Sequence, residues 1–132
     1  MAALDGLRVL VVEDSLLIAD VITEILADSG CTVIGPVARV RRALNLLRET
    51  EIDGAVLDVN LAGQLSFPVA AQLGASDIPY IFLTGYDDEN AMPPAYRSVP
   101  RLAKPFHAGE LVTALAGRLN GRSPKVRTAT GD

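Results

Sequence analysis

Short, strongly apolar runs alternate along this chain with segments in which apolar residues recur at helical spacing. The run LRVLVVE at residues 7–13 is rich in leucine and β-branched residues, as expected for a strand that is covered on both faces. Strands that alternate with helices at this spacing are joined by right-handed crossovers into a parallel sheet with helices on both faces. We therefore predict an α/β fold with five strands, at residues 7–13, 31–37, 54–59, 79–85 and 100–104.

Four segments carry the helical pattern, at residues 15–30, 39–49, 68–76 and 108–119. In the first of these, Leu17 and Val21 recur at helical spacing together with the Ile25–Leu26 pair. We therefore expect these residues to form the apolar face of that helix. Residues 86–99 break the alternation with a polar run and two adjacent prolines, so at most a short helix fits there.

The chain has 132 residues, which is the length of one domain, and about half of them are apolar. A chain of this size can bury a single core without support from a metal or a disulfide. The alternating pattern ends near residue 121. We therefore expect one domain over residues 1–121 and a mobile tail over residues 122–132.

Composition limits the partners and the compartment of the protein. No apolar run approaches the ~18 residues that a membrane span needs, and the N-terminus lacks the features of a secretory signal. The single cysteine, Cys31, cannot form an internal disulfide, which favours a reducing cytosol. A net charge of −4 disfavours binding to nucleic acid. We expect a cytoplasmic protein that binds neither membranes nor nucleic acid.

Polar and charged residues stand at the ends of four predicted strands. Glu13 and Asp14 end the first strand, and Asp58 lies in the third. Thr84 ends the fourth strand and Lys104 ends the fifth. In a doubly wound sheet, ligands bind outside the carboxyl ends of the strands, near the point where the strand order reverses. We therefore expect these five side chains to converge on one edge of the sheet.

Three converging carboxylates would take up protons or move apart unless a cation were present. Two like charges ~4 Å apart repel each other by on the order of 4 kcal/mol at an effective dielectric constant of about 20. Oxygen ligands suit a hard divalent ion, and Mg²⁺ accepts one or two carboxylates while it keeps waters and a phosphate oxygen. A carboxylate is also a nucleophile that forms an aspartyl phosphate, whose oxygens a lysine and a hydroxyl suit well. The pattern therefore indicates Mg²⁺-dependent phosphoryl chemistry.

Four motifs at these strand ends, in this order, resemble the response-regulator receiver domain over residues 7–120. They are VLVVEDS for the acidic pair, VLDVNLAG for the phospho-acceptor strand, FLTG for the switch hydroxyl and KPF for the lysine–proline element. The resemblance implies a flavodoxin-like, doubly wound sheet of five parallel strands, with helices on both faces. The fourth helix region is shortened and contains prolines in this chain, which departs from the family pattern. It also implies a role in two-component signal transduction or a phosphorelay.

The resemblance assigns the metal ligands and the phosphorylated residue. It implies that Asp58 is the phosphorylated residue and also a metal ligand. Glu13 and Asp14 are implied to help hold Mg²⁺, and the backbone carbonyl of Asn60 to complete the ligands from the protein. Mg²⁺ is therefore the expected cofactor.

The resemblance also implies the remaining contacts and the partners. Thr84 and Lys104 are expected to contact the phosphoryl group, and the Lys104–Pro105 peptide bond is often cis in this family. The expected donor is a histidine kinase or a histidine phosphotransfer protein. Self-phosphorylation and dephosphorylation, rather than enzymatic turnover of a substrate, are the expected reactions. Because no room remains for an output domain, we expect a stand-alone receiver that signals through contacts with a downstream protein.

Two departures from the family pattern concern the route of the signal. Family members commonly carry an aromatic residue three positions before the lysine, with a rotamer that follows phosphorylation, and Arg101 stands there in this chain. The motif FLTGY resembles a receiver subgroup with an FATGY-like fourth strand, often linked to alphaproteobacterial sensory kinases. The missing aromatic and the prolines lead us to expect that phosphorylation reorganises residues 86–99 and the face around Arg101.

Two alternatives share part of this chemistry. A haloacid-dehalogenase-like phosphatase also uses an aspartyl phosphate and Mg²⁺. That family expects a second aspartate two residues after the nucleophile, where this chain has Asn60, and it commonly carries a cap domain. A degenerate receiver would act only as an interaction module, but the intact acidic pair, Asp58, Thr84 and Lys104 argue against that alternative.

Overall fold

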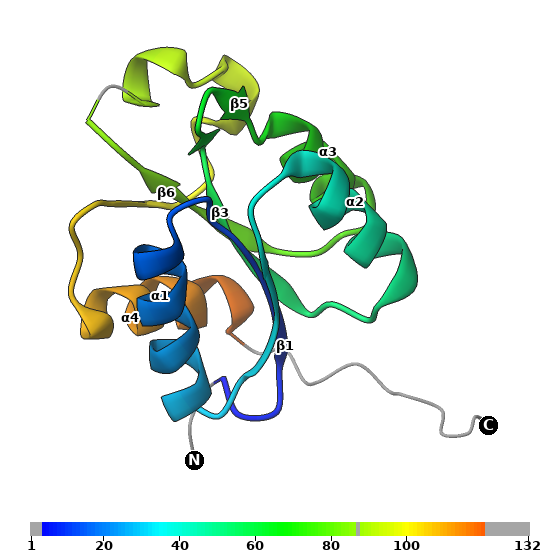
Figure 1. Cartoon of the computed structure of the whole chain (residues 1–132), viewed down its shortest axis with the longest axis vertical. Helices are drawn as coiled ribbons and strands as arrows, with labels where there is room; N and C mark the ends of the chain where they lie inside the picture. Colours follow the sequence, from blue (N-terminus) through cyan, green and yellow to red (C-terminus); the bar gives the residue numbers. More distant parts are fainter. Residues whose placement is uncertain (1–3, 87, 121–132) are drawn as a thin grey trace.

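The computed structural model describes residues 4–86 and 88–120 of the chain (Figure 1). Its centre is a five-stranded sheet in which neighbouring strands run parallel. The strands are, in chain order, β1 (Arg8–Val12), β2 (Thr32–Val37), β3 (Gly54–Asp58), β6 (Tyr80–Thr84) and β7 (Arg101–Ala103). Their order across the sheet is β2-β1-β3-β6-β7, which confirms the predicted doubly wound α/β fold.

The order of the strands reverses at β1. The chain begins in β1, moves to β2 on one side, and then returns past β1 to β3 on the other side. The register pairs Val12 of β1 with Leu57 of β3, so the next residues, Glu13 and Asp58, leave the sheet side by side. The crevice at such a reversal is where ligands bind in open α/β sheets.

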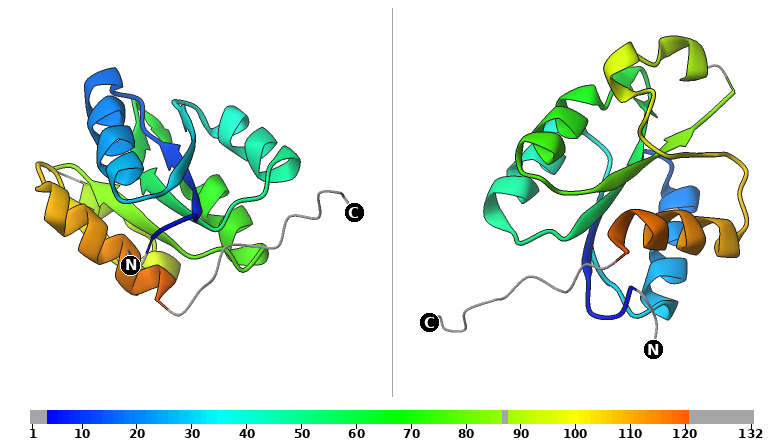
Figure 2. Two further views of the ribbon diagram at one scale, coloured as in Figure 1. Left: turned by 90° about the horizontal axis from the view of Figure 1, so that it is seen from below. Right: turned by 180° about the vertical axis from the view of Figure 1, so that it is seen from behind.

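Two helices cover each face of the sheet, as the views in Figures 1 and 2 show. They are, in chain order, α1 (Leu16–Asp28), α2 (Val40–Glu49), α3 (Phe67–Ala75) and α4 (Ala108–Leu119). Alternate residues of a strand point to opposite faces. Val9 and Val11 of β1 therefore pack with α1 and α4, and Leu10 and Val12 pack with α2 and α3. Burial on both faces explains the uninterrupted apolar runs of the central strands.

Local chemistry sets the ends of the helices that flank the carboxyl edge of the sheet. Ser15 caps α1, and its Oγ accepts a hydrogen bond from the Ile18 N–H at 3.3 Å. His107 caps α4 in a reciprocal arrangement with Glu110, whose carboxylate accepts a hydrogen bond from the His107 N–H at 2.7 Å. Gly30, just beyond α1, has a φ of +90°, which glycine adopts without strain.

The apolar face predicted for α1 is wrong in part. Leu17 is 76% exposed and Val21 is 44% exposed, whereas the buried residues of α1 are Ala19, Ile22 and Leu26. Apolar residues occur on more than one side of this helix, so helical spacing alone does not tell which side faces the sheet. The structure buries the side with Ile22 and Leu26 and leaves Leu17 and Val21 on the surface.

A hairpin that the sequence pattern did not predict follows β3. Its strands, β4 (Asn60–Leu61) and β5 (Gln64–Leu65), pair antiparallel. The two residues of the turn, Ala62 and Gly63, both have positive φ. This backbone favours an Asn-Gly or Asp-Gly pair and is uncommon for alanine, so the usual hairpin signal is missing.

The segment between β6 and β7 holds two short 3₁₀ helices, η1 (Asp88–Ala91) and η2 (Pro94–Tyr96), in agreement with the expectation of at most a short helix. The Tyr96 ring stacks on Phe67 of α3 with ring centroids 5.2 Å apart and meets the edge of Phe82 of β6 at 5.9 Å. Met92, between the two 3₁₀ helices, is buried in the same cluster. The second half of the segment is therefore anchored on the core.

Two expectations concern parts of the chain beyond the core. The mobile tail expected over residues 122–132 lies outside the described residues. Among residues 4–86 and 88–120, no helix is both long enough and apolar enough to pass through a membrane.

The two sides of α1 should respond differently to truncation. We expect Ile22→Ala to lower the free energy of unfolding by about 2–5 kcal/mol, because it opens a cavity in a buried cluster. We expect Leu17→Ala to change the same quantity by no more than about 0.5 kcal/mol, because this side chain is exposed. Urea unfolding of both variants and the wild type measures the difference, and equal losses would contradict the assigned orientation of α1.

Candidate functional site

An open depression of about 400 Å³ lies where the carboxyl ends of the strands meet at one edge of the sheet. Its charged lining consists of Glu13, Asp14, Asp58, Asp88 and Lys104. The polar and small residues that complete the lining are Ser15, Asn60, Ala62, Gly63 and Gly85. The depression therefore collects negative charge from several segments that are distant in the sequence.

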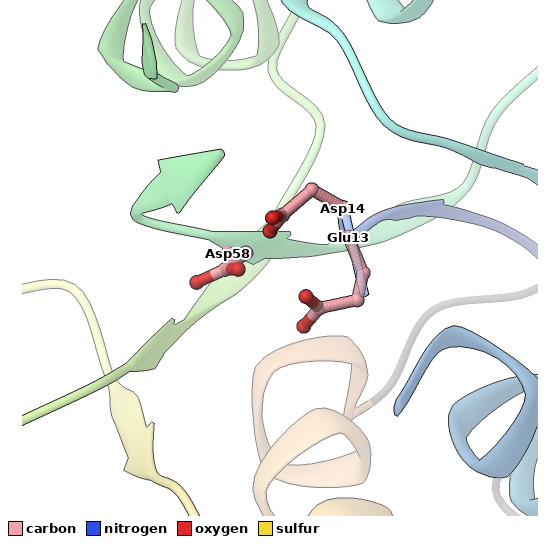
Figure 3. Close-up of side chains that lie close together, drawn as sticks. All are labelled: Glu13, Asp14 and Asp58. Carbon is pink, nitrogen blue, oxygen red and sulfur yellow. The ribbon is translucent and has the colours of Figure 1, made fainter. Parts of the chain in front are cut away.

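Three carboxylates form the centre of this depression (Figure 3). Glu13 and Asp14 follow β1 directly, and Asp58 is the last residue of β3. Each side chain offers a carboxylate oxygen, and these three oxygens lie within 4.8 Å of one another. Glu13 and Asp58 are buried and Asp14 is half-buried. Burial reduces the screening of their mutual repulsion by water, so the cluster needs positive charge nearby.

Lys104 supplies positive charge from the residue after β7. Its Nζ lies 2.8 Å from Glu13 Oε1 and donates a hydrogen bond to Asp58 Oδ2 at 3.0 Å. The Lys104 backbone N–H donates to the Thr84 carbonyl at 2.9 Å, and the Lys104–Pro105 peptide bond is cis, as expected. Three carboxylates and one ammonium leave a formal charge of −2 (three negative charges and one positive).

This environment changes the proton affinity of both partners. Burial and the neighbouring Glu13 raise the pKa of Asp58 to about 7, and Lys104 opposes the increase. Burial acts to lower the pKa of Lys104, but the contacts with Glu13 and Asp58 outweigh burial and raise it above its ordinary value. The lysine therefore stays charged, while Asp58 needs a further positive charge in order to be fully ionised near neutral pH.

The donor set fits a hard divalent cation. Glu13 Oε1 is buried and accepts no hydrogen bond from the described part of the chain, although the Lys104 ammonium lies beside it. Glu13 Oε2 accepts a hydrogen bond from the Ser15 N–H at 3.1 Å, which fixes the carboxylate at the start of α1. Oxygen ligands with this excess of negative charge are the kind that Mg²⁺ prefers.

The other predicted site residues lie at different depths. Thr84 is buried at the end of β6 and does not line the depression, whereas the next residue, Gly85, does. Asn60 lines the depression, and its Oδ1 accepts a hydrogen bond from the Gly63 N–H at 2.6 Å. The roles expected of the Thr84 hydroxyl and of the Asn60 carbonyl stay predictions.

Two residues of the depression, Gly85 and Asp88, were missed by sequence reasoning. The Gly85 N–H donates a hydrogen bond to Asp88 Oδ2 at 2.6 Å. The sequence contains a weak signal, because an aspartate side chain often accepts a hydrogen bond from a nearby backbone N–H, and Asp88 is three residues after Gly85. The sequence YDDEN at residues 86–90 is typical of a solvated loop, so the pattern alone does not indicate this contact.

Comparisons with solved structures find the same fold in several bacterial proteins. The solution structure of SdrG from Sphingomonas melonis Fr1 is 41% identical in sequence and has a TM-score of 0.77, with 90% of this chain and 99% of that chain covered. The receiver domain of the response regulator PhyR from Erythrobacter litoralis is 23% identical, with a TM-score of 0.79 and coverage of 95% and 99%. These comparisons do not test the FATGY-like subgroup, which stays a prediction.

A third solved structure and a family profile agree with these findings. A response regulator receiver protein from Sinorhizobium medicae WSM419 is 24% identical, with a TM-score of 0.73 and coverage of 91% and 99%. Among curated proteins, none matches this chain. The profile of the response regulator receiver domain matches residues 9–116, which include all six predicted site residues. The chain therefore belongs to the response regulator receiver domain family.

Proposed function

We propose that this protein is a stand-alone response regulator that receives a phosphoryl group on Asp58 and signals through contacts with another protein. Receiver domains are signalling modules of two-component systems rather than enzymes of the usual kind. One observation carries the proposal. The Asp58 carboxylate lies at the reversal of strand order, 3.0 Å from Lys104 Nζ and within 4.8 Å of the acidic pair.

The proposed reaction is a displacement at phosphorus. An Asp58 carboxylate oxygen attacks the phosphoryl group of a phosphohistidine, the P–N bond breaks, and the imidazole leaves with the bonding electrons and takes up a proton. The Lys104 ammonium, already hydrogen-bonded to Asp58, neutralises charge on the phosphoryl oxygens. The Thr84 hydroxyl is proposed as a further contact. Attack by water on the resulting acyl phosphate releases inorganic phosphate and restores the carboxylate.

A divalent cation completes the proposed site. Glu13, Asp14 and Asp58 would hold Mg²⁺ together with the backbone carbonyl of Asn60. The ion supplies positive charge that favours the ionised nucleophile and the transferring phosphoryl oxygens when it is bound. The three carboxylate oxygens within 4.8 Å of one another, with a single ammonium beside them, support this assignment.

The family assignment argues against one of the two alternatives for the chemistry. Because the chain belongs to the receiver family, we do not propose a haloacid-dehalogenase-like phosphatase. A degenerate receiver would have no need for a carboxylate cluster compensated by a buried lysine contact, which this protein retains. Binding of Mg²⁺ beside Asp58 separates the active receiver that we propose from a degenerate one.

The exposed apolar residues of α1 adjoin the proposed phosphorylation site. They line one side of an apolar hollow of about 420 Å³. The full lining consists of Leu17, Ile18, Val21, Gly85, Tyr86, Lys104, Pro105 and Phe106. Lys104 and Gly85 also line the acidic depression, so the two hollows share a rim. Tyr86 is 99% exposed. Contiguous exposed apolar side chains of this kind mark protein contacts.

We assign this apolar hollow to the phosphodonor protein. A donor that places a phosphohistidine over Asp58 must rest its own surface on the rim of the depression. The shared rim places the hollow beside the depression, and exposed Leu17 and Tyr86 offer apolar area that the contact would bury. The proposed donor remains a histidine kinase or a histidine phosphotransfer protein.

The raised pKa of Asp58 predicts a pH-dependent stability without Mg²⁺. Because the pKa of Asp58 in the folded protein is about 7, above its ordinary value, the folded state holds a proton that the unfolded state releases. The free energy of unfolding should therefore fall as the pH rises from about 5 to 7.5. Asp58→Asn removes this titration, so its stability relative to the wild type should increase over the same range. Urea unfolding of both proteins in EDTA, at the two ends of this pH range, measures the difference between their free energies of unfolding. A difference that does not change with pH would contradict the raised pKa of Asp58.

Substitution of the nucleophile should abolish phosphorylation. We expect wild-type protein to take up label from acetyl phosphate with Mg²⁺, and Asp58→Asn to take up none, because an amide oxygen is a poor nucleophile. Asp20→Asn, at an exposed position of α1, is the matched control and should label as the wild type does. Undiminished labelling of Asp58→Asn would refute the proposed acceptor.

The donor surface has a separate test. We expect Leu17→Asp to slow phosphotransfer from a histidine-phosphorylated protein about tenfold or more, the equivalent of ~1.4 kcal/mol. Labelling by acetyl phosphate should not change, because this small donor does not need the apolar hollow. Leu65→Asp, a change at an exposed leucine of the hairpin, is the control for charge on an apolar surface. Equal effects of Leu17→Asp on both donors, or on neither, would contradict the assignment.

A further inference from the structure

The acidic depression contains a carboxylate that the proposed chemistry does not use. Asp88 is the first residue of η1 and lines the depression together with the three carboxylates of the proposed metal site. Its Oδ2 accepts a hydrogen bond from the Gly85 N–H at 2.6 Å. The backbone N–H of Asp88 in turn faces the Gly85 carbonyl at 3.4 Å. Asp88 is therefore joined by two contacts to Gly85, the residue that follows Thr84.

Gly85 lies on the wall of the depression into which a phosphoryl group on Asp58 would extend. The register pairs Asp58 of β3 with Leu83 of β6, and Gly85 lies just beyond the end of β6 on the wall of the same depression. A phosphoryl group brings three oxygens that seek N–H and ammonium donors. Lys104 is one such donor, and the Gly85 N–H is another at this edge. In the unphosphorylated protein Asp88 already holds the Gly85 donor with an anionic oxygen.

We propose that Asp88 competes with the phosphoryl group for the Gly85 N–H, so that phosphorylation displaces Asp88 and releases η1. This inference rests on the proposed phosphorylation of Asp58. Two effects act in the same direction. One N–H cannot serve two anionic oxygens at full strength, and a phosphoryl group adds negative charge to a depression that already carries four carboxylates.

The displacement of Asp88 has a direct path to the surface of the protein. Glu89, the next residue, forms an ion pair with Arg101 of β7 at 2.6 Å, and Arg101 also donates to the Arg97 carbonyl. The motion should stop at Met92, which is buried, and at Tyr96, which stacks on Phe67. The part of the segment that moves is therefore η1 with the Arg101 contact, and η2 stays in place.

Asp88 is a positioning residue in this account, because it acts through the Gly85 N–H and not on the reacting atoms. Its removal should make the acceptor site easier to occupy, since the phosphoryl group no longer has to break the Asp88 contact. It should also leave the nucleophile and Lys104 unchanged. A residue with only a structural role in η1 would not alter the affinity for a phosphoryl mimic in this direction.

The test uses beryllofluoride with Mg²⁺ as a stable phosphoryl mimic, titrated into the full chain and followed by the amide resonances. We expect the Kd for beryllofluoride to be on the order of tenfold lower in Asp88→Ala than in the wild type, as loss of a competing charge-assisted hydrogen bond predicts. In the wild type, beryllofluoride should shift the Gly85 amide and the amides of η1. In Asp88→Ala, the Gly85 amide should already be displaced before beryllofluoride is added.

Two further variants separate charge from occupancy. Asp88→Asn keeps an oxygen acceptor and removes the charge, so a lower Kd in this variant assigns the competition mainly to charge, and a lower Kd only in Asp88→Ala assigns it to the hydrogen bond. Asp77→Asn is the control for net charge, since Asp77 lies before the opposite end of β6 and its φ of +57° suits asparagine. We expect its Kd to equal that of the wild type.

The outcomes distinguish this inference from the proposed function. If the wild type takes label from acetyl phosphate but Asp88→Ala binds beryllofluoride with the wild-type Kd, competition by Asp88 is refuted and phosphorylation of Asp58 stands. If Asp77→Asn lowers the Kd as much as Asp88→Asn and Asp88→Ala do, the effect is one of net charge and the inference also fails. If the wild type neither takes label nor binds beryllofluoride, the proposed function fails and this inference fails with it.

Discussion

The burial of Glu13 and Asp58 beside one ammonium group is the constraint on which the site depends. Parallel pairing of β1 with β3 places these two carboxylates side by side, although their negative charges repel each other. Lys104, which follows β7 at the edge of the sheet, reaches back to both carboxylates at 2.8 and 3.0 Å. Removal of one partner from a buried ion pair typically costs about 3–5 kcal/mol. Loss of Lys104 would therefore destabilise the fold, because it would leave Glu13 and Asp58 buried without their cation.

Two surfaces meet at the rim of this site, and they suit different tasks. The apolar hollow beside α1 is built from side chains that the core does not need, because the opposite side of α1 already packs on the sheet. The segment with η1 is polar, and its side-chain contacts include those of Asp88 with the Gly85 N–H and of Glu89 with Arg101. Gly85 belongs to the walls of both hollows. The donor protein and the proposed movement of η1 would thus both involve the backbone at Gly85.

The sequence was sufficient for the strands, for their alternation with helices and for the convergence of Glu13, Asp14, Asp58 and Lys104. These predictions depend on the burial of the central strands and on the residue at which each strand ends. Apolar runs in the sequence indicate both. Sequence reasoning failed for the face of α1, because several apolar stripes compete on one helix and only tertiary packing selects among them. It missed the hairpin because Ala62 takes a backbone conformation that its side chain disfavours. It missed Asp88 because a single contact across a short turn has no periodicity.

The contacts of Arg101 bear on how strongly the proposed movement of η1 is opposed. An aromatic side chain at this position would exchange one buried packing for another, and burial of such a ring involves several kcal/mol. Here the aromatic packing is provided by Tyr96, which contacts Phe67 of α3 and Phe82 of β6. Arg101 instead joins Glu89 in an ion pair whose side chains are 22% and 57% exposed. Exposed pairs contribute about 0–1 kcal/mol, so this link opposes rearrangement of η1 only weakly. The stronger restraint on η1 is then the contact between Asp88 and the Gly85 N–H, which lies inside the acidic depression itself.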